Sequence, residues 1–184
     1  MARADWFNLA NTVTAFRALL APVLVYLLVR GLYSHALWVF LAAGLSDALD
    51  GQIARRMNQF TRFGALLDPI ADKLVIVSCV IALAVQDLLP VWLALVVLAR
   101  DVVIVAGALG FRLLFGHLEM APLLASKVNT FMQISLILLV LLQAAGWLNV
   151  APWLPVAHGA TALAAVVSGA LYVWVWGLKA LRGG

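Results

Sequence analysis

Residues 46–73 read SDALDGQIARRMNQFTRFGALLDPIADK and hold a cluster of aspartates: Asp47, Asp50, Asp68 and Asp72. The whole chain has only eight acidic residues, so these four are half of them. Apolar sequence of membrane-spanning character flanks the stretch on both sides. Because carboxylates near a membrane are costly and are rarely left unpaired, the cluster indicates a functional site.

The composition excludes an ordinary soluble domain. The chain is 66% hydrophobic and 11% charged, whereas soluble domains contain roughly 25% charged residues. Residues Val128 to Leu178 include no Asp, Glu, Lys or Arg. One membrane helix needs about 20 mostly apolar residues, so this run is long enough for two, separated at Gly146–Pro155. Backbone groups inside lipid must be satisfied within the segment, which predicts helices rather than strands.

The sequence therefore predicts an all-α integral membrane protein with six transmembrane helices in a single domain, residues 1–184. The expected helices are Thr12–Val29, His35–Arg56, Arg62–Gln86, Pro90–Phe115, Leu123–Ala145 and Trp153–Leu181. In addition, Trp6, Phe7 and Leu9 favour a short N-terminal helix that lies in the membrane interface.

Positive charge predicts the orientation, because Lys and Arg concentrate in cytoplasmic loops. If the N-terminus is cytoplasmic, the opposite side carries only Arg30, and the cytoplasmic side carries Arg3, Arg55, Arg56, Arg62, Arg112, Lys127, Lys179 and Arg182. This asymmetry predicts that both termini and the aspartate cluster lie at the cytoplasmic face. The net charge of +4 fits anionic headgroups and anionic substrates rather than nucleic acid.

The spacing of the aspartates favours a metal site. Asp47 and Asp50 are three residues apart and Asp68 and Asp72 are four apart, so each pair shares one helical face. The short polar linker Arg56–Thr61 predicts an antiparallel hairpin that brings all four carboxylates to one level. Such a cluster is stable only with cations between the carboxylates or with some of them protonated. Hard oxygen ligands favour Mg²⁺, Mn²⁺ or Ca²⁺, and a pair of such ions suits phosphoryl chemistry.

The residues between the aspartates fit the same hypothesis. Gly51 and Gly64 have no side chain, so a ligand or a neighbouring helix can approach the backbone closely. Arg55 is four residues after Gly51 on the same face, where it can reach a bound phosphate. Two alternatives stay open, namely a structural cluster that only pairs helices and a divalent-cation transporter. A transporter would need carboxylates near the middle of the membrane.

The stretch resembles the CDP-alcohol phosphatidyltransferase family. The family motif D-x2-D-G-x2-A-R-x8-G-x3-D-x3-D is met at every fixed position: Asp47, Asp50, Gly51, Ala54, Arg55, Gly64, Asp68 and Asp72. The resemblance implies a six-helix homodimeric enzyme of the bacterial inner membrane. Such an enzyme moves a phosphatidyl group from CDP-diacylglycerol to an alcohol and releases CMP.

The resemblance also implies roles for the motif residues. The four aspartates would hold two divalent cations, Mg²⁺ or Mn²⁺, on the diphosphate of the CDP-lipid, and Gly51, Arg55 and Gly64 would contact that lipid. Asp72 would be the general base that takes the proton from the acceptor hydroxyl. A carboxylate perturbed by neighbouring carboxylates is suited to that role.

The N-terminal segment Asn8–Arg17 resembles the opening of the phosphatidylglycerophosphate synthase and cardiolipin synthase branches of the family. Asn11, Thr14 and Arg17 are spaced three residues apart and share a face. We expect Asn11 and Thr14 to contact the CDP-lipid and Arg17 to contact a phosphate. Alternatively, Arg17 merely extends its charged end to the membrane interface.

Two further segments, Leu98–Arg112 and Ser126–Gln133, resemble the CMP-forming cardiolipin synthase branch. In that case Arg100, Arg112 and Lys127 would bind the phosphate of the acceptor, phosphatidylglycerol, since a planar guanidinium suits a phosphate. Glycerol 3-phosphate would require the same basic residues. Cardiolipin synthesis is thus the leading prediction, and phosphatidylglycerophosphate synthesis is the second.

Each of these bases also has a purely structural interpretation. Arg100 can form a salt bridge inside the membrane with a neighbouring aspartate. Lys127 can be an interfacial anchor at the start of a helix, with Ser126 as the N-cap residue.

Overall fold

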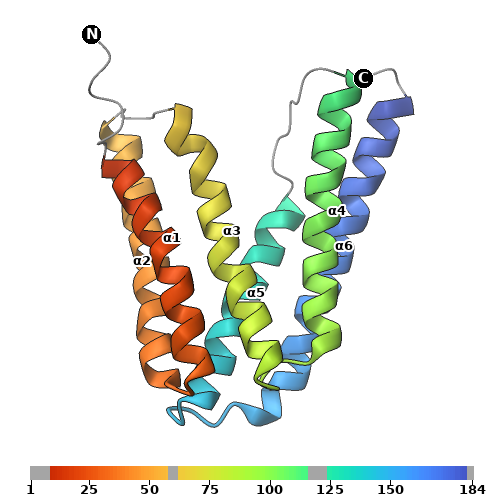
Figure 1. Cartoon of the computed structure of the whole chain (residues 1–184). Coiled ribbons are helices and arrows are strands. Elements are labelled where there is room, and N and C mark those ends of the chain that lie inside the picture. The colour runs from red at the N-terminus through yellow and green to blue at the C-terminus, as the bar shows by residue number, and fades with distance from the viewer. Residues whose placement is uncertain (1–8, 58–61, 116–123, 182–184) are drawn as a thin grey trace. The chain divides into compact units, whose positions relative to one another are not determined.

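The computed structural model describes residues 9–57, 62–115 and 124–181. Within its helices, the side chains of residues 9–18, 47–57, 62–72, 112, 114–115 and 179–181 are not described. The described residues form only helices: α1 Leu9–Val29, α2 Tyr33–Met57, α3 Arg62–Val85, α4 Val91–Phe115, α5 Leu124–Ala144, the 3-10 turn η1 Ala151–Trp153, and α6 Leu154–Leu181 (Figure 1).

The predicted all-α architecture is confirmed, and each helix lies close to its predicted range. The largest difference is at the start of α1, which begins at Leu9 rather than Thr12. The sequence from Leu9 to Thr12 contains neither Gly nor Pro, so nothing there breaks the helix. The predicted interfacial helix falls mostly on residues 1–8, which lie outside the described residues.

The chain folds as two compact units, each described here by itself. The first unit comprises Met1–Leu88 and Leu141–Leu148, and the second comprises Leu89–Val140 and Asn149–Gly184. The prediction of one domain over residues 1–184 stays a prediction.

In the first unit, α1 packs against both α2 and α3. Its buried side chains recur at helical spacing, with Ala21, Leu24 and Leu28 facing the interior. The facing residues of α2 and α3 are also small or aliphatic, including Leu37 and Leu83, each completely buried. Helix α1 thus packs against both helices that carry the aspartate motif, and this packing positions α2 and α3 in the unit.

Three helices end in the same way in this unit. After α1, the Gly31 amide donates to the Leu28 carbonyl, and the next amide donates to the carbonyl of Leu27. This is the Schellman arrangement, which requires a left-handed residue just past the helix. Asp87 after α3 and Gly146 after α5 form the equivalent bonds, with φ of 55° and 71°. Asp87 therefore terminates α3 as a left-handed capping residue.

In the second unit, α4 packs lengthwise against α6. The face of α6 that is buried carries mostly small or polar side chains, namely Thr161, Ala165, Ser168 and Tyr172. Small residues allow close approach of two helix backbones in a membrane. Further along the same contact, the ring of Trp176 occupies the space where a Cβ of Gly107 would lie.

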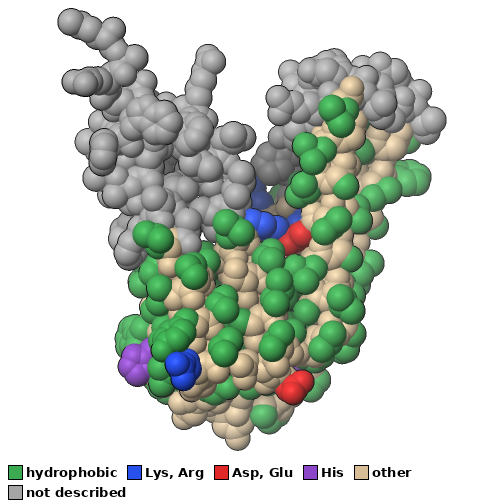
Figure 2. Space-filling view, viewed as in Figure 1, with side chains coloured by type: hydrophobic (Ala, Val, Ile, Leu, Met, Phe, Trp, Pro, Cys, Tyr) green, Lys and Arg blue, Asp and Glu red, His purple; other side chains and the backbone are tan. Residues whose placement is uncertain are grey.

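The helices have the length and composition of membrane spans. Among the described residues, three segments are long and apolar enough to cross a membrane: Val91–Phe111, Leu124–Ala144 and Ala151–Leu178. Shorter apolar segments lie in α1 and α3, at Leu19–Val29 and Lys73–Val85. Figure 2 shows apolar side chains over the described surface of α4, as expected where lipid replaces water. The chain is an all-α membrane protein. That α1, α2 and α3 also span the membrane stays a prediction.

Candidate active site

The backbone places the aspartate motif on two helices of the first unit, as predicted. Asp47 and Asp50 lie in the C-terminal half of α2, and Asp68 and Asp72 lie in the N-terminal half of α3. The C-terminal end of α2 and the N-terminal end of α3 are at the same end of this unit (Figure 1). The motif side chains lie outside the described residues: Asp47, Asp50, Gly51, Arg55, Gly64, Asp68 and Asp72. Their convergence on a metal site therefore stays a prediction.

The N-terminal candidates lie on the helix that both motif helices contact. Asn11, Thr14 and Arg17 are in the first three turns of α1, and the start of α1 is at the same end of the unit as the motif (Figure 1). Helical backbone at these positions puts the three residues on one face, as expected. Their side chains also lie outside the described residues, so their contacts with the substrates stay a prediction.

Arg100, on α4 of the second unit, is the centre of a buried polar cluster. Its Nη1 atom donates to Asp101 Oδ1 at 3.0 Å, and only 6% and 8% of these two side chains are exposed. Its Nη2 atom donates to Ser126 Oγ of α5 at 2.8 Å and to Ser168 Oγ of α6 at 2.6 Å. The salt bridge with a neighbouring aspartate, one of the two predicted interpretations of Arg100, is therefore present.

An aromatic contact completes the surroundings of the guanidinium. The Cζ atom of Arg100 lies 6.0 Å from the ring centroid of Tyr172, at the outer limit of a cation–π contact. Tyr172 in turn meets the ring of Trp176 edge to face at 5.2 Å. A Cβ at Gly169 would lie 3.4 Å from Arg100 Cγ, so glycine leaves room for the arginine stem. Three helices thus surround this one charged group.

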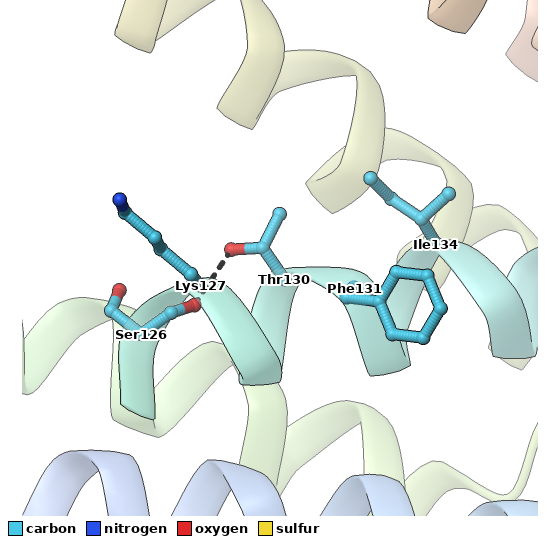
Figure 3. A pocket seen from close by; sticks show the side chains of 5 residues that line it. All are labelled: Ser126, Lys127, Thr130, Phe131 and Ile134. Atoms are coloured by element: carbon cyan, nitrogen blue, oxygen red, sulfur yellow. Dashed lines mark hydrogen bonds between the residues drawn. The ribbon is translucent and has the colours of Figure 1, made fainter. Parts of the chain in front are cut away.

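Lys127 lies beside this cluster, on the exposed face of α5. It lines an open groove of about 400 Å³ together with Ser126, Thr130, Phe131 and Ile134. Figure 3 shows the ammonium group of Lys127 extending from one end of the groove, with Phe131 and Ile134 at the other end. A cation at one end and apolar side chains at the other suit an amphiphilic anion, such as the phosphate and first acyl carbons of a lipid.

The proposed N-cap role of Ser126 is wrong. Helix α5 begins at Leu124, so Ser126 is inside its first turn. The hydroxyl of Ser126 accepts from Arg100, and its carbonyl accepts from Thr130 Oγ1 at 3.1 Å. Arg112 lies in α4, but its side chain is outside the described residues.

Sequence reasoning missed Ser168, Asn129 and Gln133. Ser168 is 68 positions from Arg100 in the chain, so only tertiary structure pairs them. Asn129 and Gln133 are 0% and 1% exposed on α5, and their amide atoms have no hydrogen-bond partner among the described residues. Their spacing of four inside an apolar helix was the available signal.

A sequence model described as CDP-alcohol phosphatidyltransferase matches residues 7–176. A probable cardiolipin synthase (CMP-forming) of Drosophila melanogaster is 37% identical over 151 residues, which cover 73% of this chain and 47% of that protein. The human cardiolipin synthase (CMP-forming) is 36% identical over 71% of this chain and 49% of its own length. The chain spans about half the length of these two animal relatives.

A bacterial relative matches over more of the chain. A probable phosphatidylglycerophosphate synthase of Mycobacterium tuberculosis is 35% identical over 178 residues, which cover 93% of this chain and 82% of that protein. The relatives therefore carry the names of both activities that the sequence motifs predict, cardiolipin synthase and phosphatidylglycerophosphate synthase.

Proposed function

The chain belongs to the CDP-alcohol phosphatidyltransferase family, and from this premise we propose that it transfers a phosphatidyl group from CDP-diacylglycerol to a glycerol-type acceptor. The observation that carries the proposal is the family match over residues 7–176, within which all eight fixed motif positions lie on helical backbone of α2 and α3. The transporter alternative has no comparable support.

The proposed reaction needs one base and one leaving group. Asp72 takes the proton from the acceptor hydroxyl, and the acceptor oxygen bonds to the phosphorus on the lipid side of the diphosphate. The bond from that phosphorus to the bridging oxygen breaks, and CMP leaves with the electron pair. We assign this role to Asp72 because a carboxylate perturbed by neighbouring charged groups can act as a general base.

The donor set at the motif fits hard divalent cations. Four carboxylates offer only oxygen ligands, which suit Mg²⁺ or Mn²⁺ and do not suit soft thiolate-seeking metals. We propose that Asp47, Asp50, Asp68 and Asp72 hold two such ions. When bound, the ions would neutralise the diphosphate and the departing CMP.

The CDP-lipid is proposed to lie along the motif face of the first unit. Gly51 and Gly64 allow close backbone approach, and Arg55 reaches a phosphate from the same helix as Gly51. Asn11 and Thr14 would contact the nucleotide part from α1. Support comes from the packing of α1 against both α2 and α3.

The preferred acceptor is phosphatidylglycerol, which would make the product cardiolipin. The groove at Lys127 supports this choice, because its cationic end and its apolar end match a phosphate that carries acyl chains (Figure 3). Arg17 and Arg112 are further proposed contacts for the acceptor phosphate. The sequence predicts the same role for Arg100, whose guanidinium is hydrogen-bonded to Asp101, Ser126 and Ser168.

Glycerol 3-phosphate is the second candidate acceptor. The observation in its favour is the Mycobacterium tuberculosis relative, named a probable phosphatidylglycerophosphate synthase, which aligns with 93% of this chain. A small soluble phosphate would use the cation at Lys127 without the apolar end of the groove.

A side-by-side assay distinguishes these acceptors. The purified full chain is supplied with CDP-diacylglycerol, Mg²⁺ and either phosphatidylglycerol or glycerol 3-phosphate, and the lipid product is identified by mass. We expect cardiolipin from phosphatidylglycerol. Turnover with glycerol 3-phosphate but not with phosphatidylglycerol would contradict this choice of acceptor. If no CMP is released with either acceptor, the result counts against the proposed function.

The cellular setting is also proposed. The excess of basic residues on one side supports a bacterial inner-membrane protein with both termini and the active site facing the cytoplasm. We propose a homodimer, by analogy with the family. Labelling of single cysteines placed near each terminus, in intact cells and in inverted vesicles, tests the orientation.

A further inference from the structure

We infer that Arg100 is a positioning residue, which ties the first turn of α5 to α4 and α6 and thereby fixes Lys127, rather than a direct ligand of the acceptor. This inference rests on the proposed acceptor role of Lys127. The inference concerns Arg100 and its contacts with the protein, and one of its two tests does not depend on the acceptor role of Lys127.

Both Nη atoms of the Arg100 guanidinium are already engaged by the protein, whereas its Nε has no hydrogen-bond partner among the described residues. Nη1 faces Asp101, and Nη2 is shared between two hydroxyl groups, those of Ser126 and Ser168. A phosphate would normally take two parallel N–H groups of an arginine at once. To do so here, it would have to displace the hydroxyls or the carboxylate from a side chain that is only 6% exposed.

Each partner of Arg100 comes from a different helix. Asp101 follows it on α4, Ser126 belongs to α5, and Ser168 belongs to α6. One planar group with rigidly directed donors thus sets the relative position of three helices at one level. Tyr172, one turn beyond Ser168 on α6, packs against the same guanidinium.

Ser126, whose hydroxyl accepts a hydrogen bond from Arg100, is the immediate neighbour of Lys127 in the sequence. Successive helical residues differ in direction by about 100°, so fixing Ser126 toward Arg100 also fixes the direction in which Lys127 leaves the helix. Thr130 adds a second restraint by donating to the Ser126 carbonyl (Figure 3). The groove at Lys127 therefore has one wall whose position depends on Arg100.

Stability alone does not account for the cluster. A buried ion pair is often no more stabilising than well-packed apolar side chains of the same volume. Its directed donors do, however, specify one arrangement of the helices. That property is useful where a cation must meet a phosphate with correct geometry.

The kinetic test uses Ser168→Ala, which removes a partner of Arg100 on α6. We expect the KM for the acceptor to rise about fivefold to tenfold, the size expected for the loss of one typical hydrogen bond. The KM for CDP-diacylglycerol and kcat should stay within about twofold, and Ser168→Thr, which keeps the hydroxyl, should restore the acceptor KM. Ser135→Ala, on α5 outside this cluster, is the matched control.

Two outcomes of this test would overturn the inference. An unchanged acceptor KM in Ser168→Ala, with a raised acceptor KM in Arg100→Lys, would make Arg100 a direct ligand. A loss of folded enzyme with both KM values unchanged would make the cluster purely structural.

A second test needs no activity, so it survives failure of the proposed function. In a Cys79→Ala background, a spin label is attached at Leu124→Cys, where the native side chain is 79% exposed at the start of α5. Without substrates, we expect Arg100→Lys and Ser168→Ala each to increase label mobility at this position. A label at Val156→Cys, about 18 Å along α6 from Ser168, is the control. Unchanged mobility at Leu124→Cys in both variants would show that Arg100 does not hold α5.

Discussion

Arg100 and Asp101 are sequence neighbours on α4 that form a buried ion pair, with 3.0 Å between Nη1 and Oδ1. Asp101→Asn removes the negative charge and leaves the buried guanidinium without its counter-charge. We expect a loss of roughly 3–5 kcal/mol in the free energy of unfolding, measured as a lower midpoint of denaturation in detergent. The double variant Arg100→Leu/Asp101→Leu should lose less than Asp101→Asn. A larger loss in the double variant would contradict this account of the pair.

The close contact of Gly107 with the Trp176 ring predicts a second destabilising change. In Gly107→Ala the new methyl group would overlap the ring, so α4 and α6 must separate or the indole must turn. Overpacking of this kind costs about 1–3 kcal/mol. Gly110→Ala is the matched control on the same helix, because nothing lies within 4 Å of its added Cβ. Equal midpoints of thermal unfolding for the two variants would refute the contact.

The left-handed backbone at Asp87 predicts a stabilising change. Asp87 has φ of 55° at the end of α3, a conformation that glycine adopts without steric cost. Asp87→Gly should raise the free energy of unfolding by up to about 1 kcal/mol. Gly31→Ala, at φ of 70° and with open space around its Cβ, should lower it. Thermal unfolding of both variants checks the prediction, and a destabilised Asp87→Gly would contradict it.

How far the sequence predicts the fold is clear from α5 and α6. Apart from Lys127 near the start of α5 and Lys179 near the end of α6, both helices are apolar runs without charge, and their ranges follow from apolar length and from the Gly and Pro residues between them. The end of α1 is equally predictable from the sequence, because Gly31 is a typical left-handed helix terminator. These features are local, so a single sequence is enough to find them.

The polar cluster around Arg100 is harder to predict from the sequence, because its contacts join residues far apart in the chain. Arg100 stands out as a charge in an apolar helix, and the adjacent Asp101 makes a salt bridge foreseeable. Nothing in the sequence indicates that Ser126 and Ser168, 26 and 68 positions away, meet the same nitrogen. For the same reason, Ser126 looked like a helix cap when it is a hydrogen-bond acceptor inside the helix.

The groove at Lys127 predicts a specific kinetic defect. Lys127→Ala removes the only cation that lines the groove among the described residues, so the acceptor KM should rise about tenfold or more. The KM for CDP-diacylglycerol should not change. Arg30→Ala, which removes an exposed cation stacked on Tyr26 in the first unit, should leave both KM values unaltered. A rise in the KM for CDP-diacylglycerol alone would indicate that Lys127 binds the donor lipid and not the acceptor.

The central claim is that the chain transfers a phosphatidyl group from a CDP-lipid with Asp72 as the base. The most direct measurement is CMP release from CDP-diacylglycerol by the purified full chain, with acceptor, with and without Mg²⁺, for the native protein and for Asp72→Asn. We predict metal-dependent CMP release by the native chain and a loss of about 10²-fold or more in Asp72→Asn. CMP release that persists in Asp72→Asn, or that continues after the divalent metal is chelated, would contradict the account.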